Sequence, residues 1–157
     1  MFLESEENKE INYGITQAIA NAFKKQLLEG DQNFASGGDK FKLALYTSSA
    51  TLNSATTAYT SSNEVGDSGA YSAGGGALTG QNTSIASGVA IVDFADLSFT
   101  GVTLTARGAL IYNTSSAVTN AAVAVLDFGA DKTATSGTFT VQFPAFTTAA
   151  AILRISG

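Results

Sequence analysis

The chain has 157 residues, a length that fits a single domain able to bury about two-thirds of the surface its unfolded form would expose. Only 13% of the residues are charged, below the roughly 25% usual in soluble domains, and the net charge at pH 7 is −5. This acidic balance argues against nucleic-acid binding, because no basic stripe is available to replace phosphate counterions. We expect the close cation pairs, Lys24 with Lys25 and Lys40 with Lys42, to be solvated flanks of a helix and a strand.

Histidine and cysteine are both absent from the sequence. These side chains most often act as acid–base groups, nucleophiles or transition-metal ligands, so we expect no enzyme, no cofactor and no metal site. The lack of cysteine also excludes a disulfide framework. Threonine, serine, glycine and alanine are abundant, as is typical of turns and close-packed strands. The composition favours a protein that works through a surface or an assembly.

Residues 1–12 are predicted to form an N-terminal arm, followed by a single β-rich domain over residues 13–157. The arm is rich in glutamate and has too little apolar surface to bury much by itself. It lacks the basic start and apolar run of a secretory signal, and no apolar stretch approaches the roughly twenty residues of a membrane span. We therefore expect no targeting segment and no membrane contact.

One amphipathic helix is predicted over about residues 13–29. Apolar residues recur at every fourth position, as Ile15, Ile19, Phe23 and Leu27. Asn12 is a candidate N-cap, and Gly30 follows the last periodic residue as a C-terminal stop.

Short strands are predicted for the rest of the domain. Residues 41–46 alternate between apolar positions and the opposite face, whereas residues 47–80 form a long Ser/Thr/Gly-rich excursion around Gly74–Gly76. Further strands are expected at residues 89–94, 102–112, 122–128, 138–143 and 149–155. Regular strands without a second helix indicate a mainly β fold, either an antiparallel β-sandwich or a jelly-roll-like barrel, with one N-terminal helix.

Two of these segments, residues 122–126 and 149–153, are apolar on both faces. A strand with one wet face should alternate, so both segments predict a second covering layer. The helix and a neighbouring copy of the chain are equally compatible with that pattern.

The carboxylates offer weak chemical signals. Asp93 and Asp127 could be the paired acids of a hydrolase, but each ends an apolar strand, where aspartate usually caps a turn. Four further aspartates lie in polar loops that superficially suit calcium, although none has the Asp-x-Asp-x-Asp spacing of a strong site: Asp31, Asp39, Asp67 and Asp131. Turn chemistry is the favoured interpretation for all of them.

Two other sets of residues have a possible binding role. The run Gly74–Gly76 is not followed by the Lys-Ser/Thr pair of a phosphate loop. Tyr46, Tyr59, Tyr71 and Tyr112 could form a sugar-stacking platform, but strand tyrosines are more often half-buried wall residues.

Several segments together resemble a known family. They are FKKQLLEG at residues 23–30, FKLALYTSSATL at 41–52, TTAYT at 56–60, NEV at 63–65, GAYSAGG at 69–75, ARGALIYN at 106–113 and AVLDFG at 124–129. In this order they are similar to a widespread family of small virion proteins of tailed bacteriophages, from about residue 20 onward. The acidic segment before Ile11 is longer than the family's usual start.

The resemblance implies that the protein is a component of the virion, but it does not indicate a particular place in the virion. We expect a capsid decoration, or cement, protein whose partner is the major capsid protein or another virion protein. Symmetric self-association is expected, with a trimer as the working hypothesis. The alternatives are a neck, tail or fibre component that binds host glycans through Tyr59, Tyr71 and the Gly74 loop, and a small glycan hydrolase that uses Asp93 or Asp127.

Overall fold

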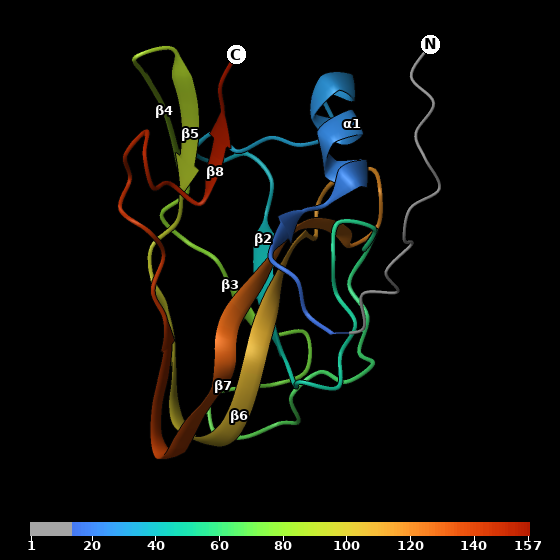
Figure 1. The fold of residues 1–157 in the computed structure, drawn as a ribbon, viewed down its shortest axis with the longest axis vertical. Helices are drawn as coiled ribbons and strands as arrows, with labels where there is room; N and C mark the ends of the chain where they lie inside the picture. The colour runs from blue at the N-terminus through green and yellow to red at the C-terminus, as the bar shows by residue number, and fades with distance from the viewer. Residues whose placement is uncertain (1–13) are drawn as a thin grey trace, which may run out of the picture.

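The computed structural model describes residues 14–157 and contains two antiparallel sheets and one short helix (Figure 1). The predicted arm at residues 1–12 lies outside the described residues. Strands account for 47% of the structure, and the two sheets do not close into a barrel. The prediction of a mainly β fold with one N-terminal helix is therefore confirmed in its sandwich-like form.

The larger sheet has five strands in the order β1-β7-β6-β2-β3. Their bounds are Ala18–Ile19 for β1, Ala121–Val141 for β7, Leu97–Asn113 for β6, Phe41–Tyr46 for β2 and Gly76–Ala77 for β3. The alternating segment predicted at residues 41–46 is thus a strand, and all six of its residues pair with β6. The long excursion after it contributes only the two residues of β3.

Strands β6 and β7 form a ribbon that bends at the end of the molecule opposite the helix (Figure 1). The sequence predicted separate strands at residues 122–128 and 138–143, but both belong to the 21-residue β7. The turn predicted between these two segments is wrong, because β7 continues to pair with β6 there, with Lys132 opposite Ala106 and Thr133 opposite Thr105. Irregular register and the positive φ of Gly129 accommodate the bend without ending the strand.

The smaller sheet has the order β4-β5-β8, formed by Asn82–Ala86, Val89–Asp93 and Leu153–Ile155. Strand β5 matches the prediction for residues 89–94. Strand β4 was not predicted, because its polar residues are exposed along its whole length and show no alternation. Most of the strand predicted at residues 149–155 is a turn, and only three residues pair with β5.

Helix α1 spans Asn21–Glu29, so the predicted start near residue 13 is wrong. Residues before the helix make backbone bonds to other segments instead: Thr16 N–H donates to Leu52 O, and β1 pairs with β7. In its extended conformation Ile19 still packs against the core, as it would in a helix. The apolar spacing of this segment therefore does not distinguish a helix from a strand. The predicted stop is confirmed, since Gly30 adopts the left-handed conformation at the C-cap.

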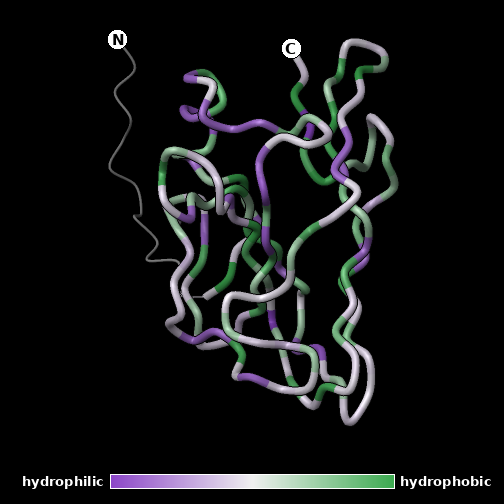
Figure 2. Tube along the Cα trace, turned by 180° about the vertical axis from the view of Figure 1, so that it is seen from behind, coloured by the Kyte–Doolittle hydropathy of each residue, from purple (hydrophilic) through white to green (hydrophobic). Residues whose placement is uncertain are grey.

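One cluster of buried side chains connects the helix, both sheets and the bent ribbon. Near α1 its centre is aromatic, with the rings of Phe34 and Phe41 stacked 4.5 Å apart and Phe94 packed against both. Residues 121–125 are buried on both faces, and α1 packs against β7, so the helix supplies the predicted covering layer for this strand. Hydrophobic residues concentrate where the strands cross the middle of the molecule (Figure 2).

Gly75 tests how closely β3 must approach β2. Its φ is +72°, and a Cβ atom there would overlap the carbonyl oxygen of Leu43. We expect Gly75→Ala to lower the free energy of unfolding by at least about 2 kcal/mol, because backbone strain and overlap add. Gly88, with φ +76° and open space around it, is the matched control, and Gly88→Ala should cost about 1 kcal/mol. Urea denaturation measures both, and equal losses would contradict the close approach.

Candidate functional site

The structure places Asp93 and Asp127 in different sheets, at the end of β5 and within β7. Asp127 accepts hydrogen bonds from the Gly129 N–H at 2.8 Å and from Arg107 Nε at 3.3 Å, so it organises the bulge of β7. The Oδ1 atom of Asp93 is buried and has no partner among residues 14–157. The two carboxylates do not form a catalytic pair.

The loop aspartates also serve local structure. Asp39 accepts hydrogen bonds from the backbone of Asn33 and from the buried side chain of Asn113, and Asp67 accepts one from Ala73 N–H. Within the described part of the chain, no three acidic side chains gather as they would around a metal ion. Asp67 therefore holds its own loop, and Asp39 holds its loop and also connects it to Asn113 at the end of β6.

The four tyrosines proposed as a stacking platform are brought together, but inside the protein. Tyr46, Tyr71 and Tyr112 are buried, and the ring of Tyr59 stacks on Tyr112 with centroids 4.8 Å apart. Their hydroxyl groups bond to the protein itself; Tyr46 donates to Thr60 O at 2.6 Å. The buried rings of Tyr46, Tyr71 and Tyr112 are not available to a sugar, and the half-buried Tyr59 has one ring face covered by Tyr112.

Glu64 is the centre of this cluster. Its carboxylate accepts hydrogen bonds from the hydroxyl groups of Tyr59 at 2.6 Å and Tyr71 at 2.8 Å, and from the Gly74 N–H at 2.7 Å. Tyr112 closes the cluster by donating to Gly74 O at 2.7 Å. Sequence reasoning gave Glu64 no role. The available signal was that it is the only charged residue between positions 47 and 66.

The surroundings of these tyrosines favour the neutral phenol. Burial raises the pKa values of all four tyrosine hydroxyl groups above their ordinary value. The Glu64 carboxylate raises these pKa values further, because it disfavours a second negative charge nearby. The cluster is therefore a structural device that attaches the long excursion to the sheet.

The feature that suits a partner is a groove between α1 and the smaller sheet, which we name the α1–β8 groove. Its larger part, about 680 Å³, is mostly apolar. The side chains that line it include Phe23, Leu27 and Leu28 of α1, Ile91 of β5, and Leu153 and Ile155 of β8. Sequence analysis could not find it, because its walls come from segments far apart in the chain.

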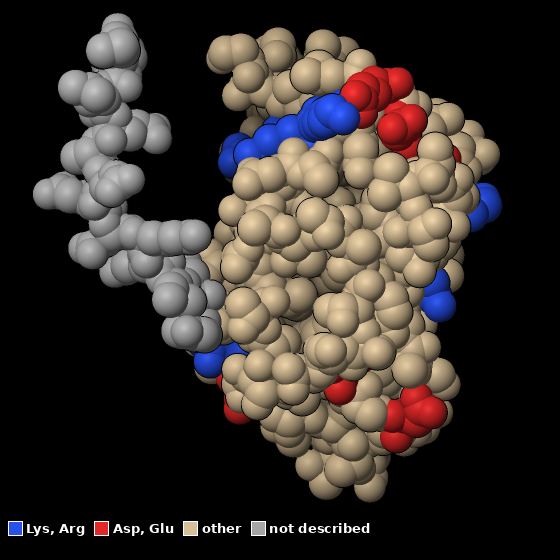
Figure 3. All heavy atoms as spheres, turned by 90° about the vertical axis from the view of Figure 1, so that its right-hand side faces the viewer, with Lys and Arg blue, Asp and Glu red and all other residues tan. Residues whose placement is uncertain are grey.

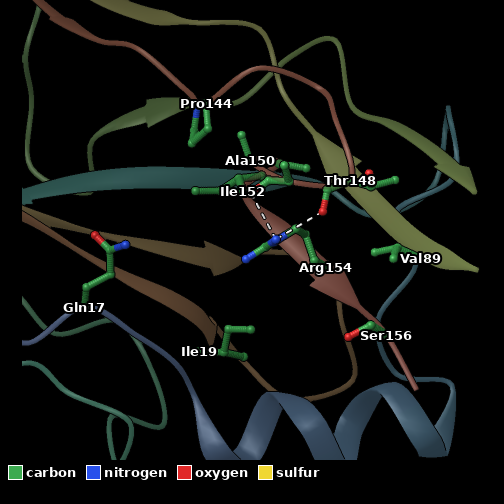
Figure 4. A pocket seen from close by; sticks show the side chains of 11 residues that line it. Gln17, Ile19, Val89, Pro144, Thr148, Ala150, Ile152, Arg154 and Ser156 are labelled. Atoms are coloured by element: carbon green, nitrogen blue, oxygen red, sulfur yellow. Dashed lines mark hydrogen bonds between the residues drawn. The ribbon is translucent and has the colours of Figure 1, made fainter. Parts of the chain in front are cut away.

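A second hollow of about 420 Å³ extends the groove toward β1. It shares Ile19, Arg154 and Ser156 with the larger part, so the two hollows lie side by side. Arg154 lies between Ile19 and the turn at residues 148–152, and its Nη1 donates to the carbonyl groups of Thr148 and Ala149 (Figure 4).

Two cations line an otherwise uncharged surface. Lys24 of α1 and Arg154 of β8 both face the groove, and neither forms an ion pair with another residue of the described range 14–157. On the face seen in Figure 3 most of the surface is uncharged, and both basic and acidic side chains lie at the end that holds α1. The groove therefore combines apolar walls with positive charge.

Comparisons with protein-family models, curated proteins and solved structures find no match to this chain. Within residues 14–157, no helix is long and apolar enough to span a membrane.

Glu64→Gln tests the tyrosine cluster. An amide has one acceptor oxygen and adds a donor that faces hydroxyl groups already acting as donors, so we expect a loss of about 1–3 kcal/mol in unfolding free energy. The matched control is Glu29→Gln, because Glu29 forms only an exposed ion pair with Lys25 at 3.0 Å and should cost less than about 0.5 kcal/mol. Urea denaturation compares the two variants, and equal effects would contradict a structural role for Glu64.

The raised tyrosine pKa values predict a loss of stability in alkali. The unfolded chain loses its phenol protons near pH 10, before the folded chain does, so stability is fully present below about pH 10 and falls above it. Urea midpoints measured against pH, together with tyrosinate absorbance, check this. Tyrosinate formation near pH 10 in a protein that stays folded and equally stable would contradict it.

Proposed function

We propose that the protein is a structural component of a tailed-bacteriophage virion, and that it decorates the capsid surface as a cement protein. The observation that carries the proposal is the α1–β8 groove, where Leu28 is 92% exposed and Ile155 is 60% exposed on β8, one edge of which pairs with no strand of residues 14–157. Exposed apolar side chains around a hollow are typical of protein–protein contact sites. The family resemblance in the sequence supports the same assignment.

The outer face of the bent ribbon also suits a role in a protein lattice. Hydroxyl groups pair across the strands there, Ser98 with Thr140 and Thr105 with Thr133, each at 2.8 Å. These hydroxyl pairs are uncharged and hydrogen-bonding, so they give little repulsion between protein copies. They can lie against a coat subunit without themselves adding charge to the contact.

Glycan binding through Tyr59 and Tyr71 is not part of this proposal, because Tyr71 is fully buried and both hydroxyl groups bond to Glu64. A location in the neck, tail or fibres differs from capsid decoration chiefly in the number of copies per particle. The partner is the major capsid protein in the first case and another virion protein in the second.

The copy number in purified virions, measured by quantitative mass spectrometry against the major coat protein, tests the assignment. We expect near-stoichiometric abundance, because a cement protein covers the lattice. A few copies per particle would overturn decoration in favour of the neck, tail or fibres. Complete absence from virions would overturn the virion proposal itself.

A further inference from the structure

We propose that the α1–β8 groove receives residues 1–13 of a second copy of this chain, which add as an extended strand to the free edge of β8. The inference deepens the proposed function, since it names a contact between copies. It is tested on purified protein alone, so its failure is distinct from failure of the virion assignment.

The edge of β8 provides the main-chain part of the contact. β8 pairs with β5 on one side, and no strand among residues 14–157 pairs with it on the other. In Figure 1 β8 is the strand of the smaller sheet that lies toward α1, and the groove is lined by α1 and Ile19 of β1 on one side and by residues of all three strands of that sheet on the other. An unpaired edge beside an apolar hollow is the arrangement that accepts an added strand, with backbone hydrogen bonds for affinity and side chains in the hollow for specificity.

The smaller sheet needs such cover. All five residues of β4 are exposed, and in β8 only Leu153 is buried. A three-stranded sheet with so little of its surface packed leaves Ile155 in water, and Leu28 of α1, which lines the same groove, is exposed as well. A strand laid in the groove would cover both side chains at once.

Charge complementarity identifies the occupant. Residues 1–13 contain four glutamates and one lysine, together with the apolar residues Met1, Phe2, Leu3, Ile11 and Tyr13. The groove presents the opposite charge through Lys24 and Arg154, beside walls that accept apolar side chains. No other stretch of the sequence combines acidic and apolar residues at this density.

The point of attachment favours a second copy over the same one. Gly14 O accepts a hydrogen bond from Leu52 N–H, and the chain then runs through β1 to the start of α1. To enter its own groove, the preceding segment would have to reverse at Gly14 and run back beside its own chain. Thirteen extended residues span up to roughly 43 Å, which is enough to reach the groove of a neighbouring copy.

Light scattering with size-exclusion chromatography over a range of concentrations gives the first test. We expect the full chain to form an oligomer and Ile155→Glu to be at least tenfold weaker in association, because a glutamate would face both the apolar walls and the acidic segment. Ile85→Glu is the matched control, since Ile85 is 73% exposed on β4 and does not line the groove. A monomeric full chain at all concentrations, or equal effects of both variants, would overturn the proposal.

Cysteine cross-linking gives a second test that does not depend on a destabilised variant, and the chain has no native cysteine to interfere. Leu3→Cys or Glu7→Cys on a tagged chain is mixed with Ile155→Cys on an untagged chain and oxidised. We expect cross-linked tagged–untagged pairs in at least tenfold higher yield than with Ile85→Cys. Equal yields would overturn the docking site, and a cross-link found only within one doubly substituted chain would show same-chain docking and overturn the exchange.

Discussion

The antiparallel pairing of β6 with β7 is the interaction on which the rest of the structure depends. It extends from Leu97 opposite Val141 to Asn113 opposite Ala121, and the other strands of the larger sheet add to its two edges. Helix α1 packs on the same ribbon. Because the ribbon bends, side chains from its two halves enter one core, and residues 14–157 bury a large apolar cluster with only one short helix among them.

Glu64 helps to fix the excursion at residues 47–80, which has more than thirty residues and almost no regular secondary structure. Withdrawing a carboxylate even partly from water is costly unless its oxygens are hydrogen-bonded, and both oxygens of the half-buried Glu64 accept from donors within the same excursion. Tyr71 also accepts from Leu45 N–H at 2.8 Å, which connects the cluster to β2. The excursion is therefore fixed by side-chain hydrogen bonds at a few points, whereas a β-strand is fixed by backbone hydrogen bonds along its whole length.

Sequence patterns predicted this fold where the signal lies within one short segment. The alternation in β2 and the stop at Gly30 were recognised because both depend on local chemistry. The start of α1 was missed because residues before it bond to β7 and Leu52, and the continuity of β7 was missed because pairing across the ribbon overrides its turn residues. Both errors depend on pairing between segments that are distant in the sequence, which a local pattern does not reveal. The groove was missed for the same reason, because its walls come from distant segments.

The groove itself follows from how its two walls are attached. Helix α1 is held by the larger sheet through β7 and through the Gln26–Gln32–Asn113 hydrogen bonds, whereas β8 belongs to the smaller sheet. No strand of residues 14–157 bridges the two sheets at this end, so apolar side chains on both walls stay uncovered while the rest of the core is closed. Because the core packs around the bent ribbon and this end stays open, a contact made here would cover apolar side chains without displacing any pairing within the two sheets.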